Sequence, residues 1–157
     1  MARAVDRFLE AAYRAGLSIE VRRFPQETRT AADAARAVGC DVGQIVKSLV
    51  LVADGEPFLA LTSGANRADP DRLAELLSVK EVRRATPEEA REATGFAIGG
   101  TPPLGHPRQL RVLMDADLMQ YDLVWAAAGA PDAVFPVAPS DLEAAAGAEV
   151  TDFKQRP

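Results

Sequence analysis

The sequence has almost none of the side chains that disulfides and transition-metal sites require. Among its 157 residues there is one cysteine, Cys40, and one histidine, His106. A single cysteine cannot close an internal disulfide, and one cysteine with one histidine cannot complete a Cys/His metal site. We therefore expect a protein without metal or other cofactor, in a reducing, cytoplasmic setting.

Long apolar runs are also missing. The longest, Ser48 to Ala53 and Val124 to Ala130, are far shorter than the roughly 20 residues that a membrane helix needs. Asp6 and Glu10 interrupt the apolar residues near the N-terminus, which excludes the continuous core of a signal peptide. With 48% hydrophobic and 26% charged residues, the composition indicates one soluble domain over residues 1–157.

Positive charge is scarce overall and unevenly distributed. The net charge of −5 argues against avid nonspecific binding to nucleic acid, because that affinity comes mainly from neutralising phosphates. Residues 1–47 nevertheless hold eight Arg/Lys against six Asp/Glu, whereas residues 111–157 hold three against eight. The N-terminal excess is interpreted either as a local basic patch or as ordinary solvated surface. The arginines concerned are Arg14, Arg22, Arg23, Arg29 and Arg36.

Periodicity and capping residues predict an irregular alternation of helices and strands. Helices are expected over residues 2–16, 31–38, 71–77, 87–95 and 140–146. The N-terminal caps expected for the last four are Thr30, Asp69, Thr86 and Ser140. Strands are expected over residues 17–24 (ended by Pro25), 45–52, 57–61, 110–114, 123–128 with Trp125 in the core, 134–137 and 149–153. Asp54-Gly55 between two apolar runs predicts a hairpin. This order favours an α+β fold with a mixed, largely antiparallel, barrel-like sheet flanked by helices.

Lys47 is the first anomaly in this pattern. It lies inside the apolar, β-branched run from Ile45 to Val52. Burying an unpaired ammonium costs several kcal/mol or forces the group to lose its proton. One interpretation is a lysine whose stem reaches along the strand to water. The other is a lysine at the mouth of a pocket, facing a polyanionic or carbonyl-bearing substrate.

The second anomaly is the loop Gly99-Gly100-Thr101-Pro102-Pro103-Leu104-Gly105-His106. Paired glycines allow a ligand to approach the backbone and leave N–H groups free for an oxyanion, and the prolines stiffen the loop. Surface loops that bind nothing also collect glycine and proline. His106 has no evident nucleophile beside it, so we interpret it as a residue that shapes the loop or borders the substrate. The turn Ser63 to Arg67 offers a phosphate-facing arginine or, equally, a solvated turn.

Three blocks of the sequence, in this order, resemble the YbaK family, which is related to the inserted editing domain of bacterial prolyl-tRNA synthetase. They are Thr30 to Leu51 with Gln-Ile-Val-Lys-Ser, Leu61 to Leu77 with Thr-Ser-Gly-Ala-Asn-Arg-Ala-Asp, and Thr94 to His106 with Gly-Phe-Ala-Ile-Gly-Gly-Thr-Pro-Pro-Leu-Gly-His. Val124 to Gly129 is a weaker fourth block.

The resemblance implies a freestanding deacylase that hydrolyses the ester between a mischarged amino acid and the 3′-terminal adenosine of a tRNA. The family's lysine falls on Lys47, which would anchor and polarise the substrate. Its Gly-x-x-x-Pro loop falls on Gly99 to Pro103, whose backbone, with Gly99 and Gly100 as the catalytic positions, would hold the aminoacyl carbonyl while water attacks. The residues expected to bind substrate are Thr30, Ser48, Ser63, Asn66, Arg67, Thr101, Pro102, Pro103, His106 and Ala127.

One departure from the family concerns the amino-acid pocket. Where some members carry a serine before Ala-Gly, this sequence reads Ala127-Ala128-Gly129. The amino acid removed from tRNA(Pro) is therefore open among cysteine, alanine, serine and other small residues. Two further functions stay open, a noncatalytic module that binds tRNA or a synthetase, and a hydrolase of a small nucleotide or ester. The expected partners are the acceptor end of an aminoacyl-tRNA and prolyl-tRNA synthetase, and the expected state is a monomer.

Overall fold

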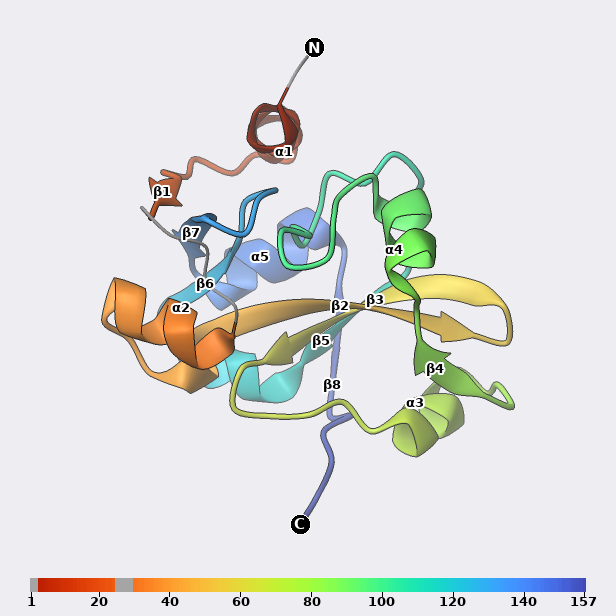
Figure 1. Ribbon diagram of the computed structural model, residues 1–157. Helices are drawn as coiled ribbons and strands as arrows, with labels where there is room; N and C mark the ends of the chain where they lie inside the picture. Colours follow the sequence, from red (N-terminus) through yellow and green to blue (C-terminus); the bar gives the residue numbers. More distant parts are fainter. Residues whose placement is uncertain (1–2, 25–29) are drawn as a thin grey trace.

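The computed structural model describes residues 3–24 and 30–157 (Figure 1). Pro25 and Arg29, which entered the predictions above, lie outside the described residues. All five predicted helices are present within a residue or two of their expected bounds. They are α1 (Ala4–Arg14), α2 (Ala31–Val38), α3 (Pro70–Leu77), α4 (Pro87–Thr94) and α5 (Pro139–Ala146), with two 3₁₀ turns, η1 (Val42–Gln44) and η2 (Ala116–Gln120).

Local capping explains most of these helix ends. The Thr30 hydroxyl accepts a hydrogen bond from the Asp33 N–H at 3.0 Å, and Thr86 with Glu89 forms a reciprocal capping box. The prediction that Ser140 caps α5 is wrong. The helix begins one residue earlier, with proline at its first position, because the fixed φ of proline suits that position and its missing N–H is not needed there.

Eight strands of the described residues form one mixed sheet, in the order β1-β7-β6-β2-β3-β5-β8 with β4 beside β2. Their bounds are β1 (Arg22–Arg23), β2 (Ile45–Ala53), β3 (Glu56–Ser63), β4 (Val82–Arg84), β5 (Val112–Asp115), β6 (Val124–Ala127), β7 (Ala133–Val137) and β8 (Glu149–Thr151). The predicted hairpin at Asp54-Gly55 joins β2 to β3 in the longest ladder, which is antiparallel. β2 with β6, β3 with β5, and β5 with β8 are parallel pairs.

The strand predicted over residues 17–24 is confirmed only at Arg22 and Arg23, which pair with the first two residues of β7. The apolar alternation of Leu17, Ile19 and Val21 was nevertheless meaningful, because these side chains pack against the main core. The error has a physical reason. Burial on one side produces the same alternation whether or not a neighbouring strand supplies backbone hydrogen bonds.

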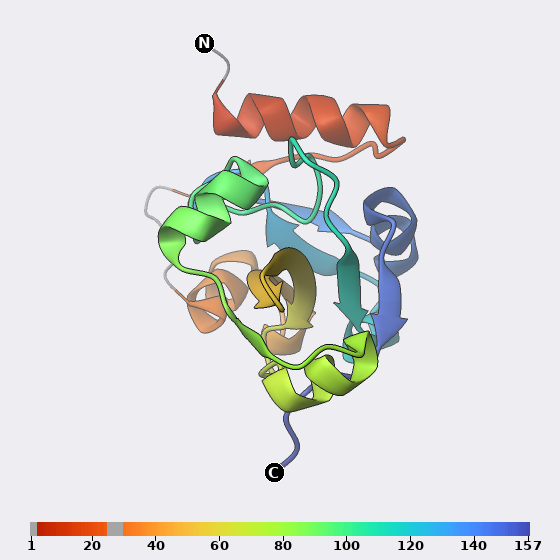
Figure 2. The same cartoon turned by 90° about the vertical axis from the view of Figure 1, so that its right-hand side faces the viewer.

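The two faces of β2 support different hydrophobic clusters. Val46 and Val50 belong to the larger cluster, which α1, α4 and α5 complete, whereas Leu49 and Leu51 belong to a smaller cluster completed by α3. Figure 2 shows α1 and α3 on opposite sides of the sheet. Side chains alternate between the two faces along a strand. The Lys47 side chain therefore lies on the α3 side of β2, and the Ser48 side chain lies on the opposite side.

The edge of β2 that faces away from β3 is shared by two short strands with a gap between them. β6 pairs with Ile45 and Val46, and β4 pairs with residues 51–53. Residues 47–50 therefore have no strand beside this edge within the described part of the chain. This gap in the sheet positions the candidate site.

Backbone groups of β2 reach into that gap. The Gly64 N–H donates to the Ile45 carbonyl on the β3 side at 2.7 Å, and the Ala85 N–H donates to the Val50 carbonyl on the opposite side at 3.1 Å. Alternate residues of a strand share the same orientation of their backbone groups. Ser48 is oriented like Val50, so its N–H and C=O point into the gap, where no strand is available to pair with them.

Candidate functional site

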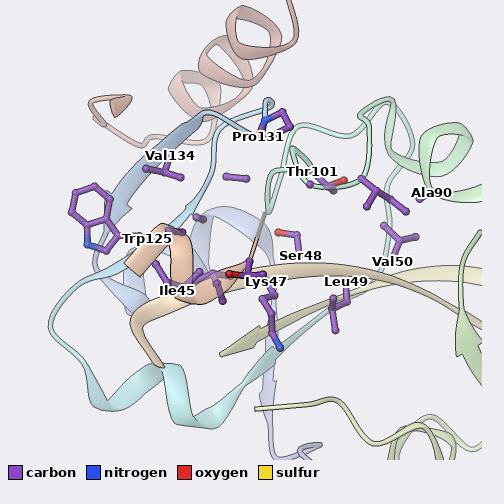
Figure 3. Close-up of a pocket in the computed structure, with 18 of the residues that line it drawn as sticks. Ile45, Lys47, Ser48, Leu49, Val50, Ala90, Thr101, Trp125, Pro131 and Val134 are labelled. Atoms are coloured by element: carbon purple, nitrogen blue, oxygen red, sulfur yellow. The ribbon is translucent and has the colours of Figure 1, made fainter. Parts of the chain in front are cut away.

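A cavity of about 330 Å³ opens at the gap in the sheet (Figure 3). Its walls come from β2, from the end of β4 and the start of α4, from the glycine-rich loop, from α2, and from β6 and β7. The side chains and backbone that line it are Thr30, Ala31, Ala34, Ile45, Val46, Lys47, Ser48, Leu49, Val50, Arg84, Ala85, Ala90, Ile98, Gly99, Thr101, Trp125, Ala126, Ala127, Pro131, Ala133 and Val134.

Six of the residues expected to act on substrate line this cavity together, although they come from four separate parts of the chain. They are Thr30, Lys47, Ser48, Gly99, Thr101 and Ala127. The other seven lie outside the lining: Gly100, Ser63, Asn66, Arg67, Pro102, Pro103 and His106. The sequence therefore predicted a set of residues that the fold divides into a pocket and its supporting structure.

Lys47 extends from β2 on the side opposite to Ser48 and Thr101 (Figure 3). Its Nζ donates a hydrogen bond to the backbone carbonyl of Asn66 at 2.6 Å. Burial lowers the pKa of the Lys47 ammonium below its ordinary value, and the positive charges of Arg67 and then Arg84 lower it further. The lysine is thus half-buried and held by a neutral acceptor, and no carboxylate of residues 3–24 or 30–157 forms an ion pair with its Nζ.

A buried carboxylate fixes the acceptor that holds Lys47. Asp115 is 1% exposed, and its Oδ2 accepts hydrogen bonds from Asn66 Nδ2 at 2.9 Å and from the Ser63 N–H at 3.0 Å. Asn66 Nδ2 also donates to Asp117 Oδ2 at 2.8 Å. Ser63 and Asn66 therefore anchor the turn behind Lys47, and neither lines the cavity.

The Asp117 carboxylate extends this network to the C-terminal segment. Its Oδ2 accepts a hydrogen bond from Lys154 Nζ at 2.7 Å, and this ion pair, followed by the hydrogen bond from Asn66, lowers the pKa of Asp117. The turn after β3 is thereby tied to both β5 and the chain end. The charge of Asp115 itself acts on Lys47, where it raises the pKa and partly offsets the effects of burial and of the arginines.

Ser48 carries an unpaired polar atom on the other face of β2. Its Oγ is buried and has no hydrogen-bond partner within the described residues. A buried hydroxyl without a partner costs about 1–3 kcal/mol, so such groups are few in folded proteins. Because Ser48 also lines the cavity and faces Thr101, the hydroxyl is available to a bound ligand (Figure 3).

The glycine-rich loop presents only part of its backbone. The Gly100 N–H is not free, because it donates to the Ala97 carbonyl at 3.1 Å. Gly100 is a packing position, since a Cβ there would stand 2.8 Å from the Cα of Ala130. Gly99 has a φ of +93°, which favours glycine. The N–H groups of Gly99 and Thr101 have no backbone acceptor within the described chain.

His106, Pro102 and Pro103 form the base of this loop. The His106 ring bonds the Pro102 carbonyl through Nε2 at 2.9 Å, and burial lowers the pKa of His106 below its ordinary value. His106 lines a separate open groove beside α1. His106 therefore contacts the loop backbone and does not line the cavity.

Three site residues were not predicted from the sequence. Arg84 lines the cavity from β4, a strand that the sequence did not predict. Trp125 was expected in the core but is half-buried and lines the cavity, with the Arg22 guanidinium 5.7 Å from its ring centre. Asp115 is the last residue of the buried strand β5. An aspartate at the end of an apolar strand is a pattern from which its hydrogen bonds to the turn next to Lys47 could have been predicted.

Cys40 is half-buried beside α2, and burial raises the pKa of its thiol, with Asp41 adding to the effect. In the part of the chain that the structure describes, no group of three or more His, Cys, Asp and Glu side chains is arranged to hold a metal ion. No described helix is both long enough and apolar enough to cross a membrane.

The mixed sheet, the cavity at its edge and the glycine-rich loop define a small α+β domain with a candidate pocket. The family model for the aminoacyl-tRNA editing domain matches residues 25–145, and the chain belongs to this family. The resemblance to YbaK-type and prolyl-tRNA synthetase editing domains is thereby confirmed.

Solved and curated relatives support the same assignment. A crystal structure proposed to be that of a trans-editing enzyme for prolyl tRNA synthetase is 46% identical with a TM-score of 0.93, covering 99% of each chain. The protein YwhH of Bacillus subtilis (strain 168) is 27% identical over 124 residues, 78% of both chains. The proline–tRNA ligase of Nitratidesulfovibrio vulgaris (strain DP4) is 36% identical over 81 residues, which are 52% of this chain and 14% of the ligase.

Proposed function

We propose that the protein hydrolyses, in trans, the ester that links a misattached small amino acid to the 3′-terminal adenosine of a tRNA, with tRNA(Pro) as the preferred tRNA. The observation that carries this proposal is the set of unpaired polar groups on the cavity wall. The Ser48 hydroxyl has no hydrogen-bond partner and the N–H groups of Gly99 and Thr101 have no backbone acceptor in the described residues, and all three residues line the same cavity.

These groups suit ester hydrolysis without a protein nucleophile. In the proposed reaction a water oxygen attacks the carbonyl carbon, the negative charge moves to the carbonyl oxygen, and the C–O bond to the ribose then breaks as the ribose oxygen takes a proton. Fixed N–H donors at the developing oxyanion accelerate such reactions by about 10²–10³ for each donor. Gly99 and Thr101 are the donors in this scheme, and Lys47 adds positive potential from the sheet.

The cavity wall also supports a small, uncharged amino-acid side chain. Ala31 and Ala34 of α2 line the cavity together with Ala126 and Ala127 of β6, so this part of the lining carries no charged side chain. A charged side chain would lose its hydration there without gaining a partner. Alanyl-, cysteinyl- and seryl-tRNA(Pro) are the substrates to compare.

The test is a deacylation assay on these three tRNAs with wild-type protein, Lys47→Ala and Lys80→Ala. Lys80 is an exposed lysine at the turn before β4 and serves as the matched control for loss of one positive charge. We expect Lys47→Ala to lose most of its turnover while retaining the wild-type circular dichroism spectrum, and Lys80→Ala to retain its turnover. Binding of tRNA without hydrolysis of any mischarged tRNA would refute the proposal in favour of a noncatalytic module.

A further inference from the structure

Three of the N-terminal arginines from which a basic patch was considered form ion pairs in the folded protein. Arg14 pairs with Glu10 at 2.6 Å, and Arg23 pairs with Asp132 at 3.3 Å. Arg36 pairs with Asp33, and Arg22 lies over the Trp125 ring. A protein with a net charge of −5 binds RNA phosphates mainly through cations that have no carboxylate partner.

Arg84 is one such cation, and the sheet places it on the same face as Lys47, near enough for its charge to lower the pKa of the lysine. It pairs with Leu51 across β2 and β4, and paired residues project from the same face of a sheet. Lys47 precedes Leu51 by four residues, so it shares that face. Arg84 is exposed and lines the cavity with Lys47. Its guanidinium makes no hydrogen bond or ion pair with any residue that the structure describes.

Arg67 approaches the same lysine from the other side of β2. It follows Asn66, whose carbonyl holds Lys47 Nζ at 2.6 Å, and its own carbonyl accepts a hydrogen bond from the Gln155 N–H at 2.7 Å. The backbone of this turn is therefore fixed, while the Arg67 guanidinium is exposed and without a partner in the described residues. Asp115, the carboxylate whose charge acts on Lys47, is buried and already accepts three hydrogen bonds.

We propose that Arg67 and Arg84, on either side of Lys47, bind the phosphodiester on the 5′ side of the terminal adenosine of the tRNA. The inference rests on the proposed function, because it assumes that the ester enters the adjoining cavity. The ester and this phosphate belong to one nucleotide, so the phosphate would lie close to the ester pocket, which Arg84 lines and beside which Arg67 follows the residue that holds Lys47. Arginine guanidinium groups match phosphate oxygens through paired N–H donors.

Binding is tested with an uncharged RNA hairpin that ends in the single-stranded CCA of a tRNA, by measuring Kd over about 50–200 mM KCl. Each phosphate contact to a single strand contributes about −0.7 to the slope of log K against log[salt]. We expect Arg84→Ala and Arg67→Ala each to weaken binding about tenfold and to reduce the slope, with a total reduction of about 0.7 in the double variant because both arginines bind one phosphodiester. The matched control is Arg83→Ala on the same strand, whose side chain pairs with Glu89 at 2.8 Å, and it keeps the wild-type slope.

Turnover gives a second, independent test. We compare kcat/KM for aminoacyl-tRNA with that for 3′-O-aminoacyl-adenosine, which lacks the phosphate. The ratio of the two falls about tenfold in Arg84→Ala and is unchanged in Arg83→Ala, because only the former removes a phosphate contact. Unchanged slopes and ratios in both Arg84→Ala and Arg67→Ala would overturn the phosphate site while leaving the deacylase intact.

The remaining outcomes separate the two proposals. If wild-type protein hydrolyses neither substrate but Arg84→Ala and Arg67→Ala still reduce the salt slope, the proposed function fails and the phosphate site stands. Inorganic phosphate is the third probe. If it raises the melting temperature of wild-type protein but not of Arg84→Ala, and RNA binding is the same in both, the cluster takes free phosphate and the assignment to RNA is wrong.

Discussion

Asp115 fixes the turn that holds Lys47 without bonding to the lysine itself. The substitution Asp115→Asn tests how much these hydrogen bonds contribute. The carboxylate accepts hydrogen bonds from Ser63, Asn66 and Asp117, at 3.0, 2.9 and 2.9 Å. An asparagine has one acceptor oxygen in place of two, so at least one of these donors must lose its partner. The Asn66 carbonyl, which holds Lys47 Nζ, is part of the turn that these bonds fix.

The magnitude follows from the burial of Asp115, which is 1% exposed. A hydrogen bond to a charged group contributes about 1.5–3 kcal/mol. For a domain of this size that loss lowers the melting temperature by about 3–12 °C. The substitution also removes the negative charge that raises the pKa of Lys47, so the pKa of the lysine falls further. The alkaline limb of the pH–rate profile should therefore move to lower pH, an effect that simple loosening of the turn would not produce.

The assay is urea denaturation combined with the pH dependence of deacylation, and Asp117→Asn is the control. Asp117 bonds the same Asn66 amide, but its side chain is 34% exposed and its ion pair with Lys154 contributes about 0–1 kcal/mol. We expect the control to unfold close to wild type. If Asp115→Asn has the wild-type unfolding midpoint, the network does not position Lys47 and the reasoning fails.

Three further substitutions probe the cavity and its loop. Ser48→Ala removes a buried hydroxyl that has no hydrogen-bond partner, so the free energy of unfolding in urea should stay unchanged or rise by up to about 1 kcal/mol. The same substitution should lower kcat/KM about tenfold. A destabilised variant would mean that the hydroxyl has a hydrogen-bond partner in the folded protein. Gly100→Ala should cost about 1–3 kcal/mol by the same measurement, because its Cβ would stand 2.8 Å from the Ala130 Cα; a wild-type midpoint would show that the loop yields freely. His106→Gln tests the lowered pKa of His106. Because the folded protein disfavours the charged ring, the free energy of unfolding falls as the pH drops from the ordinary pKa of histidine toward the lower pKa of the folded state. The stability of wild type relative to His106→Gln should therefore decrease between about pH 7 and about pH 5, and a constant difference would contradict the assignment.

Most of the local structure could be predicted because it depends on neighbouring residues. Thr30 caps α2, Thr86 with Glu89 caps α4, and Asp54-Gly55 turns the hairpin, each through contacts within a few positions along the chain. Errors arose where the outcome depended on distant partners. The strand expected before Phe24 is short because β7 pairs with only two of its residues.

The candidate site was predicted only in part for the same reason. Lys47 and Ser48 were both predicted as site residues. Whether each of them faces the cavity depends on the gap between β6 and β4. β4 reads Val82-Arg83-Arg84, a short strand with no apolar alternation, so its pairing with β2 left no pattern in the sequence. Arg84 was missed with it.

The gap in the sheet explains how one strand can contact both the ester and the phosphate of the proposed substrate. In a fully paired strand, the backbone of Ser48 would be used in the ladder and its neighbours would be covered on both sides. Because β6 and β4 leave residues 47–50 uncovered on one edge, the cavity is lined from both faces of β2. Ser48 then faces the loop at Thr101, and Lys47 projects from the opposite face with Arg84. An ester on one side and its phosphate on the other could therefore contact consecutive residues of the same strand. A β4 that continued along this edge as far as residue 47 would close it, so the short length of β4 is a requirement of the proposed site.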